Sequence, residues 1–306
     1  MDEVQMMLLD GDVGEGILKL VTDFKILRSE AKPDEWAEFS EKGFLAHPCV
    51  RLVHEDPFTH HAFTQPRGYS GDAELIDYMY RIRQPPAEIS KLGRAIFRLN
   101  TQVETTDVSA GVPAPESVRE RRKIIAEMID EMAEVKDNLR ILSIACGHLR
   151  EAHISKAVKE EKIGKYFALD QDASSLGVVS REFAGSNVQT VHASIKSLFT
   201  NGHNFTDMDF VYAAGLFDYL TEPVAIRLAA RVFEMLRPGG KLLVANFAPC
   251  LRDIGYMETF MRWKLIYRNE ADVADFARCI LENEVENQRL FWDNAKNVIY
   301  LEITKK

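Results

Sequence analysis

The segment with the clearest chemical potential is a short apolar run that ends in small residues, followed by a second run that ends in an acid. Arg140–Ile144 leads into Ala145–Gly147, and Tyr166–Leu169 leads into Asp170. A strand, a tight turn and a helix N-terminus direct backbone N–H groups toward a ligand at the strand's carboxyl end. An acid at the tip of the next strand accepts hydrogen bonds from both hydroxyls of a ribose. The pattern therefore predicts a site for a nucleotide-like cofactor.

The turn itself does not match the dinucleotide fingerprint. The pattern G-x-G-x-x-G would need glycines where the chain has Ala145, Leu149 and Ala152. The first glycines of that fingerprint let the backbone approach a pyrophosphate, so their absence argues against NAD and FAD. A ligand with a ribose and no diphosphate remains, and S-adenosylmethionine (SAM) fits. The alternative is an ordinary buried strand–helix–strand unit, which this segment alone leaves open.

Two later strand tips extend the pattern. The third expected strand ends at 192–194 and the fourth leads into 213–219. Because ligands of an open α/β sheet lie over the carboxyl ends of its strands, we expect all four tips to meet in one crevice. Ser194 either hydrogen-bonds an adenine amino group or caps a helix. The cofactor contacts predicted in this half of the chain are Ser143, Ala145, Cys146, Gly147, Arg150, Glu151, Asp170, Gln171, Ala193, Ser194, Ala214 and Gly215.

A loop in the first half of the chain, Pro66–Asp72, has an aromatic residue between two glycines, beside an arginine and an aspartate. Tyr69 is predicted to pack near the cofactor's sulfonium through cation–π attraction, which makes it both a cofactor-binding and a catalytic candidate. Arg67 is predicted to pair with a carboxylate. The alternative is a structural loop with Tyr69 in the core and Arg67 paired with Asp72 on the surface.

The segment after the fifth expected strand supplies further substrate candidates. On a helix over 258–267, aromatic side chains recur on one side, where they would line a pocket or simply belong to the core. Arg268 at its end would hold a substrate carboxylate, unless it is a solvated charge. The substrate-binding residues predicted over the whole chain are His60, Arg67, Tyr219, Asn246, Trp263, Tyr267 and Arg268.

The need for a general base depends on the acceptor. A carboxylate or a thioether is nucleophilic at neutral pH, whereas an amine or hydroxyl usually has to lose a proton. Asp218, Glu258 or a histidine would take that proton. No metal is expected, since His148 and His153 are five residues apart and no carboxylate lies at zinc-site spacing.

These residues require two kinds of supporting structure. Up to about residue 115 the apolar periodicity is helical, and Thr105–Pro115 is predicted to be a linker. After residue 138, strands alternate with helices, which predicts a doubly wound, mostly parallel sheet with an antiparallel strand pair at the end. The predicted strands are 140–145, 165–169, 188–192, 209–213, 241–246, 288–294 and 297–303. The predicted helices are 16–30, 33–44, 73–83, 87–99, 115–135, 149–158, 174–183, 223–236 and 258–267, and 237–240 is predicted to be a turn.

Composition narrows the class. The chain has 306 residues, 46% of them hydrophobic, and a net charge of −9. The acidic balance argues against DNA or large RNA as a substrate. No apolar run reaches 18 residues, so no membrane span is expected. The four cysteines lack paired spacing and the N-terminus lacks a basic signal-peptide region, which together predict a cytoplasmic protein.

The order of these pieces resembles the core of class I SAM-dependent methyltransferases. The matching strings are I-L-S-I-A-C-G-H-L-R-E, A-L-D-Q-D and L-R-P-G-G-K-L-L-V, and the likeness covers about 138–306. Most such enzymes have a glycine where this chain has Leu149 and often an acid where it has Ser143. That departure affects the contacts to the methionine end of the cofactor rather than the fold.

A narrower resemblance covers about 47–306. The strings P-R-G-Y-S-G-D-A, A-G-L-F-D-Y-L and M-E-T-F-M-R-W-K-L-I-Y-R are similar to a bacterial subgroup that includes enzymes making hydroxypalmitic acid methyl ester. The resemblance implies a helical N-terminal lid and substrate region over 1–115 and a Rossmann-like core of seven strands over 116–306.

The resemblance also implies an activity. We expect methyl transfer from SAM to a small molecule, with a carboxylate as the acceptor. The alternative is S- or N-methylation of an amino-acid-like metabolite such as methionine. A methyltransferase acting on protein or RNA, and a SAM-binding protein without turnover, remain weaker alternatives. Whether the protein is a homodimer is left open.

Overall fold

The computed structural model describes residues 1–102, 113–200 and 205–306. The chain forms two compact units, one made of Met1–Arg119 with Cys250–Lys264 and the other of Glu120–Pro249 with Leu265–Lys306. The predicted linker, Thr105–Pro115, lies outside the described residues except at 113–115, where helix α8 begins. The first unit includes a segment from late in the chain that the sequence assigned to the core.

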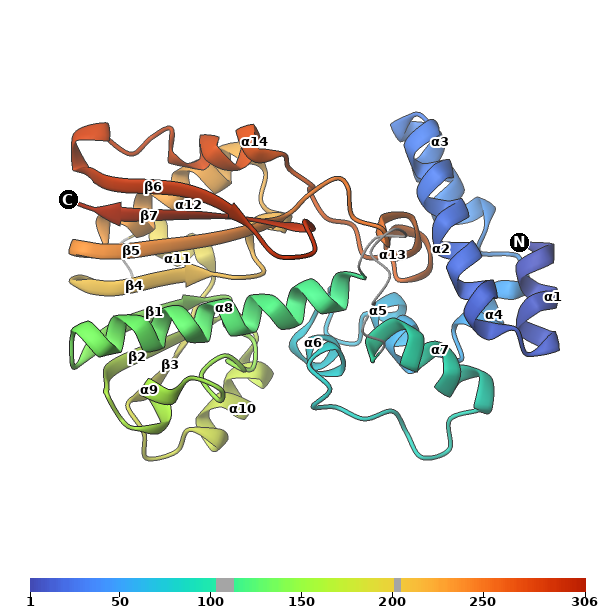
Figure 1. Ribbon diagram of the computed structural model, residues 1–306, viewed down its shortest axis with the longest axis horizontal. Coiled ribbons are helices and arrows are strands. Elements are labelled where there is room, and N and C mark those ends of the chain that lie inside the picture. Colours follow the sequence, from blue (N-terminus) through green and yellow to red (C-terminus); the bar gives the residue numbers. More distant parts are fainter. Residues whose placement is uncertain (103–112, 201–204) are drawn as a thin grey trace. The chain divides into compact units, whose positions relative to one another are not determined.

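The larger unit is built on one seven-stranded sheet with the order β3-β2-β1-β4-β5-β7-β6 (Figure 1). Strand β7 is antiparallel to both of its neighbours, whereas β1 to β5 are parallel. This is the strand order of the Rossmann-like methyltransferase fold, which confirms the predicted fold class. The strands are β1 (Leu139–Ile144), β2 (Ile163–Asp170), β3 (Val188–His192), β4 (Met208–Ala213), β5 (Leu236–Phe247), β6 (Val285–Trp292) and β7 (Val298–Lys305).

All seven predicted strands are present, but β5 is longer than expected. Met208 pairs with Leu236 and Phe210 pairs with Lys241, so the predicted turn over 237–240 is an irregularity inside β5. Gly239 has a φ of +75°, a value that L side chains rarely adopt. Four residues of β5 therefore stand opposite one residue of β4, and the strand bulges there without ending.

Helices pack against this sheet and bury its apolar side chains. Strand β4 is buried along its whole length, as the near-continuous apolar run of a central parallel strand requires. The buried face of α12 includes Ala225, Leu228 and Val232, which belong to the same apolar core as β4 and β5. The helices of this unit are α8 (Ala114–Val135, which begins in the first unit), α9 (Lys156–Lys159), α10 (Ala173–Glu182), α11 (Ile195–Phe199), α12 (Glu222–Glu234) and α14 (Glu270–Ala274), with short 3₁₀ turns at Phe217–Tyr219, Asp275–Ala277 and Glu282–Glu284.

The predicted helix over 149–158 is wrong. Leu149 has a φ of +53°, a left-handed conformation that cannot continue a right-handed helix. The chain turns irregularly until Ser155, whose side chain caps α9 by accepting from Val158 N at 3.2 Å. Asp130 of α8 holds this start in place, accepting from Ser155 Oγ at 2.6 Å and from Ala157 N at 2.9 Å.

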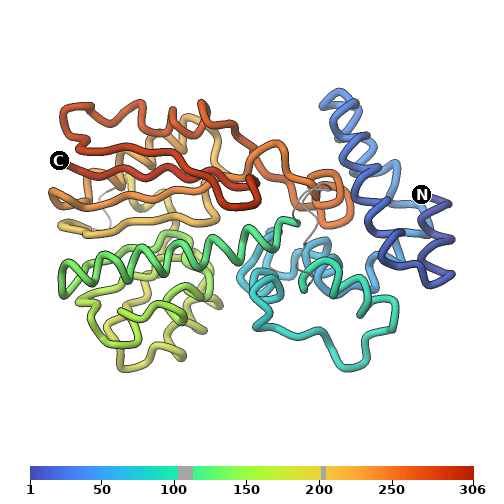
Figure 2. Tube along the Cα trace, viewed as in Figure 1, coloured from blue at the N-terminus to red at the C-terminus, as the bar shows by residue number. Residues whose placement is uncertain are grey.

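The other unit is helical among the residues that the structure describes (Figure 2). Helix α13 is inserted from late in the sequence and packs against α2 at very close range. A Cβ on Gly255 of α13 would lie 2.3 Å from Phe24 O, so only glycine fits there. The elements of this unit are α1 (Asp2–Asp10), α2 (Val13–Glu30), α3 (Pro33–Glu38), the π-helix Phe39–Gly43, α4 (Cys49–Val53), α5 (Pro57–Thr64), α6 (Ala73–Met79), α7 (Lys91–Thr101) and α13 (Ile254–Phe260).

The predicted helix over 258–267 is also wrong. Helix α13 ends at Phe260, and Arg262 two residues later has a φ of +49°. Trp263 N then donates to Met257 O at 2.9 Å, which turns the chain back on the helix. Trp263 and Tyr267 therefore do not form a helical stripe.

Two other predicted helices have shifted ends for local reasons. Ser90 caps α7 through Gly93 N, so α7 starts at Lys91 rather than at residue 87. Helix α6 ends at Met79 rather than at residue 83, and Arg81 follows with a φ of +61°. Among the helices of the described residues, none is both long enough and apolar enough to cross a membrane.

Candidate functional site

The tips of the central strands meet as the sequence predicts. Cys146 N donates to Leu169 O at 3.1 Å, which joins the end of β1 to the end of β2. Ala193 N donates to Asp170 O at 3.0 Å, which joins the start of the β3 loop to β2. Ser143 of β1 pairs in register with Tyr212 of β4. Backbone hydrogen bonds and sheet register therefore place the four tips at one edge of the sheet.

The turn after β1 has an alternating left-handed backbone. Ala145, Gly147 and Leu149 have φ values of +54°, +53° and +53°, although only one of them is glycine. A left-handed conformation costs a non-glycine residue roughly 1–2 kcal/mol. Such strain persists where the surrounding structure holds it, which is common at functional sites. The turn thus holds two non-glycine residues, Ala145 and Leu149, in a conformation that glycine adopts more easily.

Asp170 is the side chain that closes this turn. One carboxylate oxygen accepts from Gly147 N and the other from Asp172 N, each at 2.8 Å. The residue is only 7% exposed, so its orientation is fixed. Each oxygen of an ionised carboxylate has a second lone pair that these bonds do not use. The geometry leaves both oxygens able to accept a further hydrogen bond.

A buried chain of hydroxyl groups lies behind the turn. Tyr212 OH donates to Glu151, and Tyr212 OH and Tyr166 OH are 2.5 Å apart. Ser143, the cofactor candidate on β1, is the register partner of Tyr212 on β4. Burial raises the pKa of Glu151, and the hydrogen bond from Tyr212 partly offsets that rise. Sequence reasoning selected Ser143 and Glu151 but missed the two tyrosines, because aromatic residues inside strands look like ordinary core.

Arg121 of α8 is a third residue that the sequence did not single out. Its Nη1 donates to Ala214 O at 2.6 Å, beside the tip of β4. A Cβ on Gly215 would come within 3.5 Å of Arg121 Nη2. Its positive charge lowers the pKa of Glu151 and that of Asp218, which burial raises. The arginine is therefore a buried cation at the predicted crevice. Its residue type and its place among the charges of a long helix give no sequence signal that it is buried.

Two other predicted cofactor residues are Arg150, which forms an ion pair with a neighbouring helix, and Cys146, which is a buried thiol. Arg150 Nη1 donates to Glu182 at 2.5 Å, and His153 Nε2 lies 2.7 Å from the same carboxylate. Burial, together with the charges of Asp170 and Glu151, raises the pKa of the Cys146 thiol well above its usual range, so the thiol stays protonated. Among the described residues, no group of three or more His, Cys, Asp or Glu could hold a metal ion.

Three residues predicted to serve catalysis or substrate binding form one buried cluster. Asp218 accepts from Phe247 N at 2.7 Å, and burial raises its pKa to about 6. Asn246 accepts from Arg268 Nη1 at 2.7 Å, and Arg268 also donates to Phe217 O at 2.8 Å. The cluster fastens the loop after β4 to the end of β5. Arg268 is therefore neither on a helix nor a solvated charge, and its donors are directed at protein acceptors.

In the helical unit, the loop over 66–72 is fixed by different contacts from those expected. Arg67 pairs with Glu74 at 2.7 Å rather than with Asp72. Asp72 instead caps α6 and lies 2.8 Å from His61 Nε2. Tyr69 is 36% exposed, so the alternative that placed it in the core is wrong. Its predicted role beside a sulfonium stays a prediction.

Glu258, a predicted base, is engaged inside the helical unit. Its carboxylate accepts from Trp36 Nε1 at 2.5 Å and from Arg28 Nε at 3.2 Å. The side chain is 6% exposed, and both donors come from the N-terminal helices. His60 is exposed, with its ring 5.9 Å from that of His54. The contacts of Glu258 favour a structural role.

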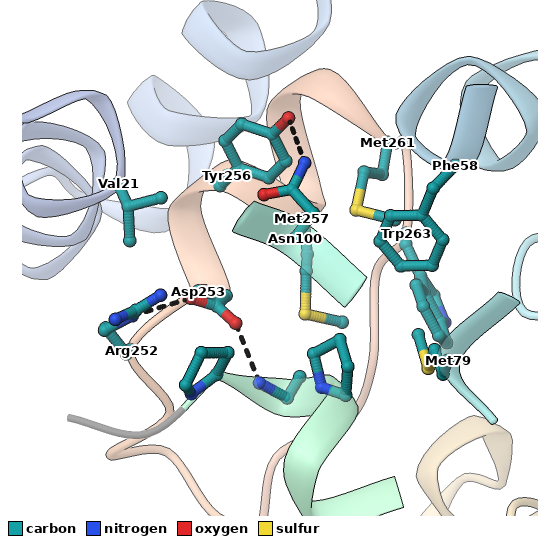
Figure 3. Close-up of a pocket in the computed structure, with 13 residues that line it drawn as sticks. Val21, Phe58, Met79, Asn100, Arg252, Asp253, Tyr256, Met257, Met261 and Trp263 are labelled. Atoms are coloured by element: carbon teal, nitrogen blue, oxygen red, sulfur yellow. Dashed lines mark hydrogen bonds and ion pairs between the residues drawn. The ribbon is translucent and has the colours of Figure 1, made fainter. Parts of the chain in front are cut away.

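The helical unit also encloses a pocket with about 380 Å³ of empty space, part of it open to solvent (Figure 3). Its walls are mostly apolar and come from segments far apart in the sequence. Trp263 is the predicted substrate residue that lies in its wall. The lining residues are Val21, Phe58, Met79, Asn100, Pro113, Ala114, Pro115, Arg252, Asp253, Tyr256, Met257, Met261 and Trp263.

Comparison with known proteins adds information on the fold. No protein-family model matches the chain, and no curated protein matches its sequence. Among solved structures, it is similar to a possible exported protein from Bordetella parapertussis, at 15% identity and a TM-score of 0.58, with 96% of each chain covered. At this identity the likeness shows the fold, over nearly the whole of both chains.

Two further structures show weaker similarity. One is the N-methyltransferase NodS from Bradyrhizobium japonicum WM9 in complex with S-adenosyl-L-homocysteine, at 14% identity and a TM-score of 0.43, with 61% of this chain and 87% of NodS covered. The other is the magnesium protoporphyrin IX methyltransferase from Synechocystis PCC 6803 with the same compound bound, at 11% identity and a TM-score of 0.46, with 75% and 100% covered.

Proposed function

We propose that this protein is a SAM-dependent methyltransferase. The observation that carries the proposal is the tip of β2, where Asp170 is fixed by two backbone N–H groups beside a left-handed turn. This arrangement stands at the carboxyl edge of a sheet with the order β3-β2-β1-β4-β5-β7-β6. A carboxylate held there with both oxygens still able to accept suits a ribose diol.

The residues at the strand tips fit the parts of the cofactor. Asp170 would accept from the ribose hydroxyls, and the backbone of 145–149 would surround the methionine end. Ala193 and Ser194 would contact the adenine, and the Arg121 guanidinium would hold the methionine carboxylate. When bound, the sulfonium supplies an activated methyl group. The protein's task is then to align the acceptor and exclude water.

We further propose that the acceptor is a small molecule with a carboxylate, methylated on oxygen. A carboxylate is already nucleophilic at neutral pH and needs no base. The engagement of Glu258 by Trp36 and Arg28 supports a reaction without that residue as base. The subgroup resemblance, with its fatty acid methyl ester, supports the same acceptor class.

A second candidate is N- or S-methylation of an amino-acid-like metabolite. One observation favours the N-methylating form. Burial raises the pKa of Asp218 to about 6, close to the value at which a general base works best near neutral pH.

We also propose that the protein works in the cytoplasm, since all four of its cysteines are free.

Calorimetry with SAM and with S-adenosylhomocysteine tests the cofactor site. Asp170→Asn should weaken the binding of both compounds by at least tenfold, because each hydrogen bond to a charged group is worth roughly 1.5–3 kcal/mol. The matched control is Asp172→Asn, which alters the cap of α10 two residues away. No affinity in the wild-type protein, or equal affinity in both variants, would contradict the proposed function.

Labelled SAM with a panel of acids, amines and thioethers then tests the acceptor class. Transfer to acids alone supports O-methylation of a carboxylate. Transfer to amines supports the second candidate if two further conditions hold. The transfer rate should fall as pH drops through about 6, and Asp218→Asn should lose most of that rate. Cofactor binding without transfer to any small molecule, protein or RNA would indicate a binding protein without turnover.

A further inference from the structure

Glu151 is a buried acid, and the part of the chain that the structure describes gives it no ion pair. The residue is 7% exposed, and the Tyr212 hydroxyl donates to its carboxylate. A carboxylate taken out of water is costly unless hydrogen bonds or an opposite charge stabilise it. Since a carboxylate can accept about four hydrogen bonds, one neutral hydroxyl leaves most of this capacity unused.

The carboxylate lies near the turn after β1. It reaches Tyr212 of β4, whose register partner on β1 is Ser143, two residues before the left-handed turn. Its negative charge also raises the pKa of the buried Cys146 thiol inside that turn. Asp170, at the tip of β2, acts on the same thiol. The acid is therefore close to the strand tips that the proposed cofactor would contact.

Charged and titratable groups face Glu151 from the elements packed around it. Arg121 and Arg122 of α8 lower its pKa, which burial raises. Burial and the charge of Glu151 raise the pKa of the Tyr166 and Tyr212 hydroxyls well above their usual range, so both stay protonated. The two arginines are thus the cations that act on this acid.

The methionine end of the proposed cofactor carries both signs of charge. Arg121 is proposed to hold its carboxylate, so its ammonium group still needs an anionic partner. Two buried acids feel the charge of Arg121, namely Glu151 and Asp218. Asp218 already serves the fold, because Phe247 N donates to it at 2.7 Å. Among the described residues, no backbone N–H of another residue donates to Glu151, so its carboxylate can accept from an incoming cation.

We propose that Glu151 binds the ammonium group of the cofactor's methionine end while Arg121 holds the carboxylate. The two side chains together would recognise an amino acid by both of its charges. The site would then distinguish the full cofactor from adenosyl compounds that lack the amino group. This role rests on the proposed function and adds to it a residue that sets cofactor specificity.

Calorimetry with S-adenosylhomocysteine and with desamino-S-adenosylhomocysteine, in which hydrogen replaces the amino group, tests this role. The wild-type protein should bind the first compound at least about tenfold more tightly, the worth of one hydrogen bond between charged groups. Glu151→Gln, which removes the charge and keeps the shape, should lower this preference to about threefold or less. The matched control is Glu302→Gln, at a buried glutamate of β7 that pairs with Lys241 and Arg289, and it should keep the preference.

The outcomes separate the role of Glu151 from the proposed function. If the wild-type protein binds neither compound, the proposed function fails. If it binds both compounds equally, or if Glu151→Gln keeps the full preference, the cofactor site stands and the role of Glu151 is contradicted.

The wild-type protein decides the question if Glu151→Gln does not fold. Its preference should weaken as the pH is lowered from about 8, because burial raises the pKa of Glu151 and the acid then takes up a proton while the ammonium stays charged. Asp218, with a pKa of about 6, titrates as well, so Asp218→Asn is measured beside it and should keep this pH dependence. A preference that does not change with pH, or a pH dependence that disappears in Asp218→Asn, would contradict the role of Glu151.

Discussion

The strand-tip region and the pocket of the helical unit are held together differently. At the strand tips, backbone groups and full charges dominate: Asp170 is fixed by N–H groups, and Arg121 lies near two buried acids. The wall of the helical pocket is mostly apolar and includes the Arg252–Asp253 ion pair. Behind its Asn100, the buried Asp56 accepts from neutral donors, Thr59 and Asn100. Full charges and backbone groups therefore fix the first region, whereas a buried polar cluster lies behind the apolar wall of the second.

The largest expected effect comes from breaking the charged design. Arg268→Met should lower the free energy of unfolding by about 3–5 kcal/mol, because it leaves buried carbonyl groups without a donor and removes a charge that favours ionised Asp218. Urea unfolding measures the change. Arg278→Met, at an arginine that is 57% exposed, is the control and should change little. A loss below 1 kcal/mol for Arg268→Met would mean that this cluster does not hold the loop.

The two buried aspartates permit a direct comparison by pH. Burial raises the pKa of Asp56 and that of Asp218 to about 6, from an ordinary value of 3.8. The folded state therefore binds these protons more tightly than the unfolded state, so each group lowers stability as pH rises from about 4 to 6. Each should cost roughly 2–3 kcal/mol between pH 4 and pH 7.

Urea unfolding of Asp56→Asn and Asp218→Asn across that pH range checks this expectation. The difference in stability between the wild-type protein and each variant should move in favour of the variant as pH rises. Carboxylates with lowered pKa, such as Asp209, give the opposite trend, but they are present in all three proteins and cancel in the difference. A difference that does not depend on pH would show that the aspartate is not buried in the way described.

The contrast between the two regions also explains what the sequence could predict. The strands and their tips follow from local apolar runs that end in small or acidic residues, so the sheet and the positions of Ala145–Gly147 and Asp170 were predictable. The helical pocket combines side chains from α2, α5, α6, α7 and α13, with nothing local to mark them. Arg121 was missed for a related reason, because a charge on a long helix shows its buried partner only after folding.

The wrong helices had a common physical cause. Residues 149–158 and 258–267 have helical periodicity, but Leu149 and Arg262 adopt left-handed conformations within them or at their edge. Neither leucine nor arginine prefers that conformation, so nothing in their residue types signals it. Tertiary contacts of the turn after β1 and of the chain after α13 override the local preference.

A medium effect on stability is expected in the buried hydroxyl chain behind the turn after β1. Tyr212→Phe should cost about 1–3 kcal/mol of stability, because Glu151 loses the hydroxyl that donates to it while remaining buried. Tyr166→Phe is the matched control, since it removes the outer hydroxyl and leaves the Tyr212–Glu151 bond in place. Thermal unfolding compares the two. Equal losses of stability in the two variants would contradict this expectation. They would mean that the Tyr212–Glu151 hydrogen bond contributes no more than the Tyr166–Tyr212 bond.

The smallest effect tests the strain in the turn after β1. Ala145 is exposed and has a φ of +54°, so Ala145→Gly should relieve about 1–2 kcal/mol of strain, offset in part by the greater freedom of glycine in the unfolded chain. The expected net gain in the free energy of unfolding is roughly 0.5–1 kcal/mol. Ala271→Gly, at an exposed position of α14 in the same unit, should instead lose about 0.5–1 kcal/mol. The opposite signs of two identical substitutions separate backbone strain from helix propensity. A loss in both variants would show that the left-handed turn costs this chain nothing at Ala145.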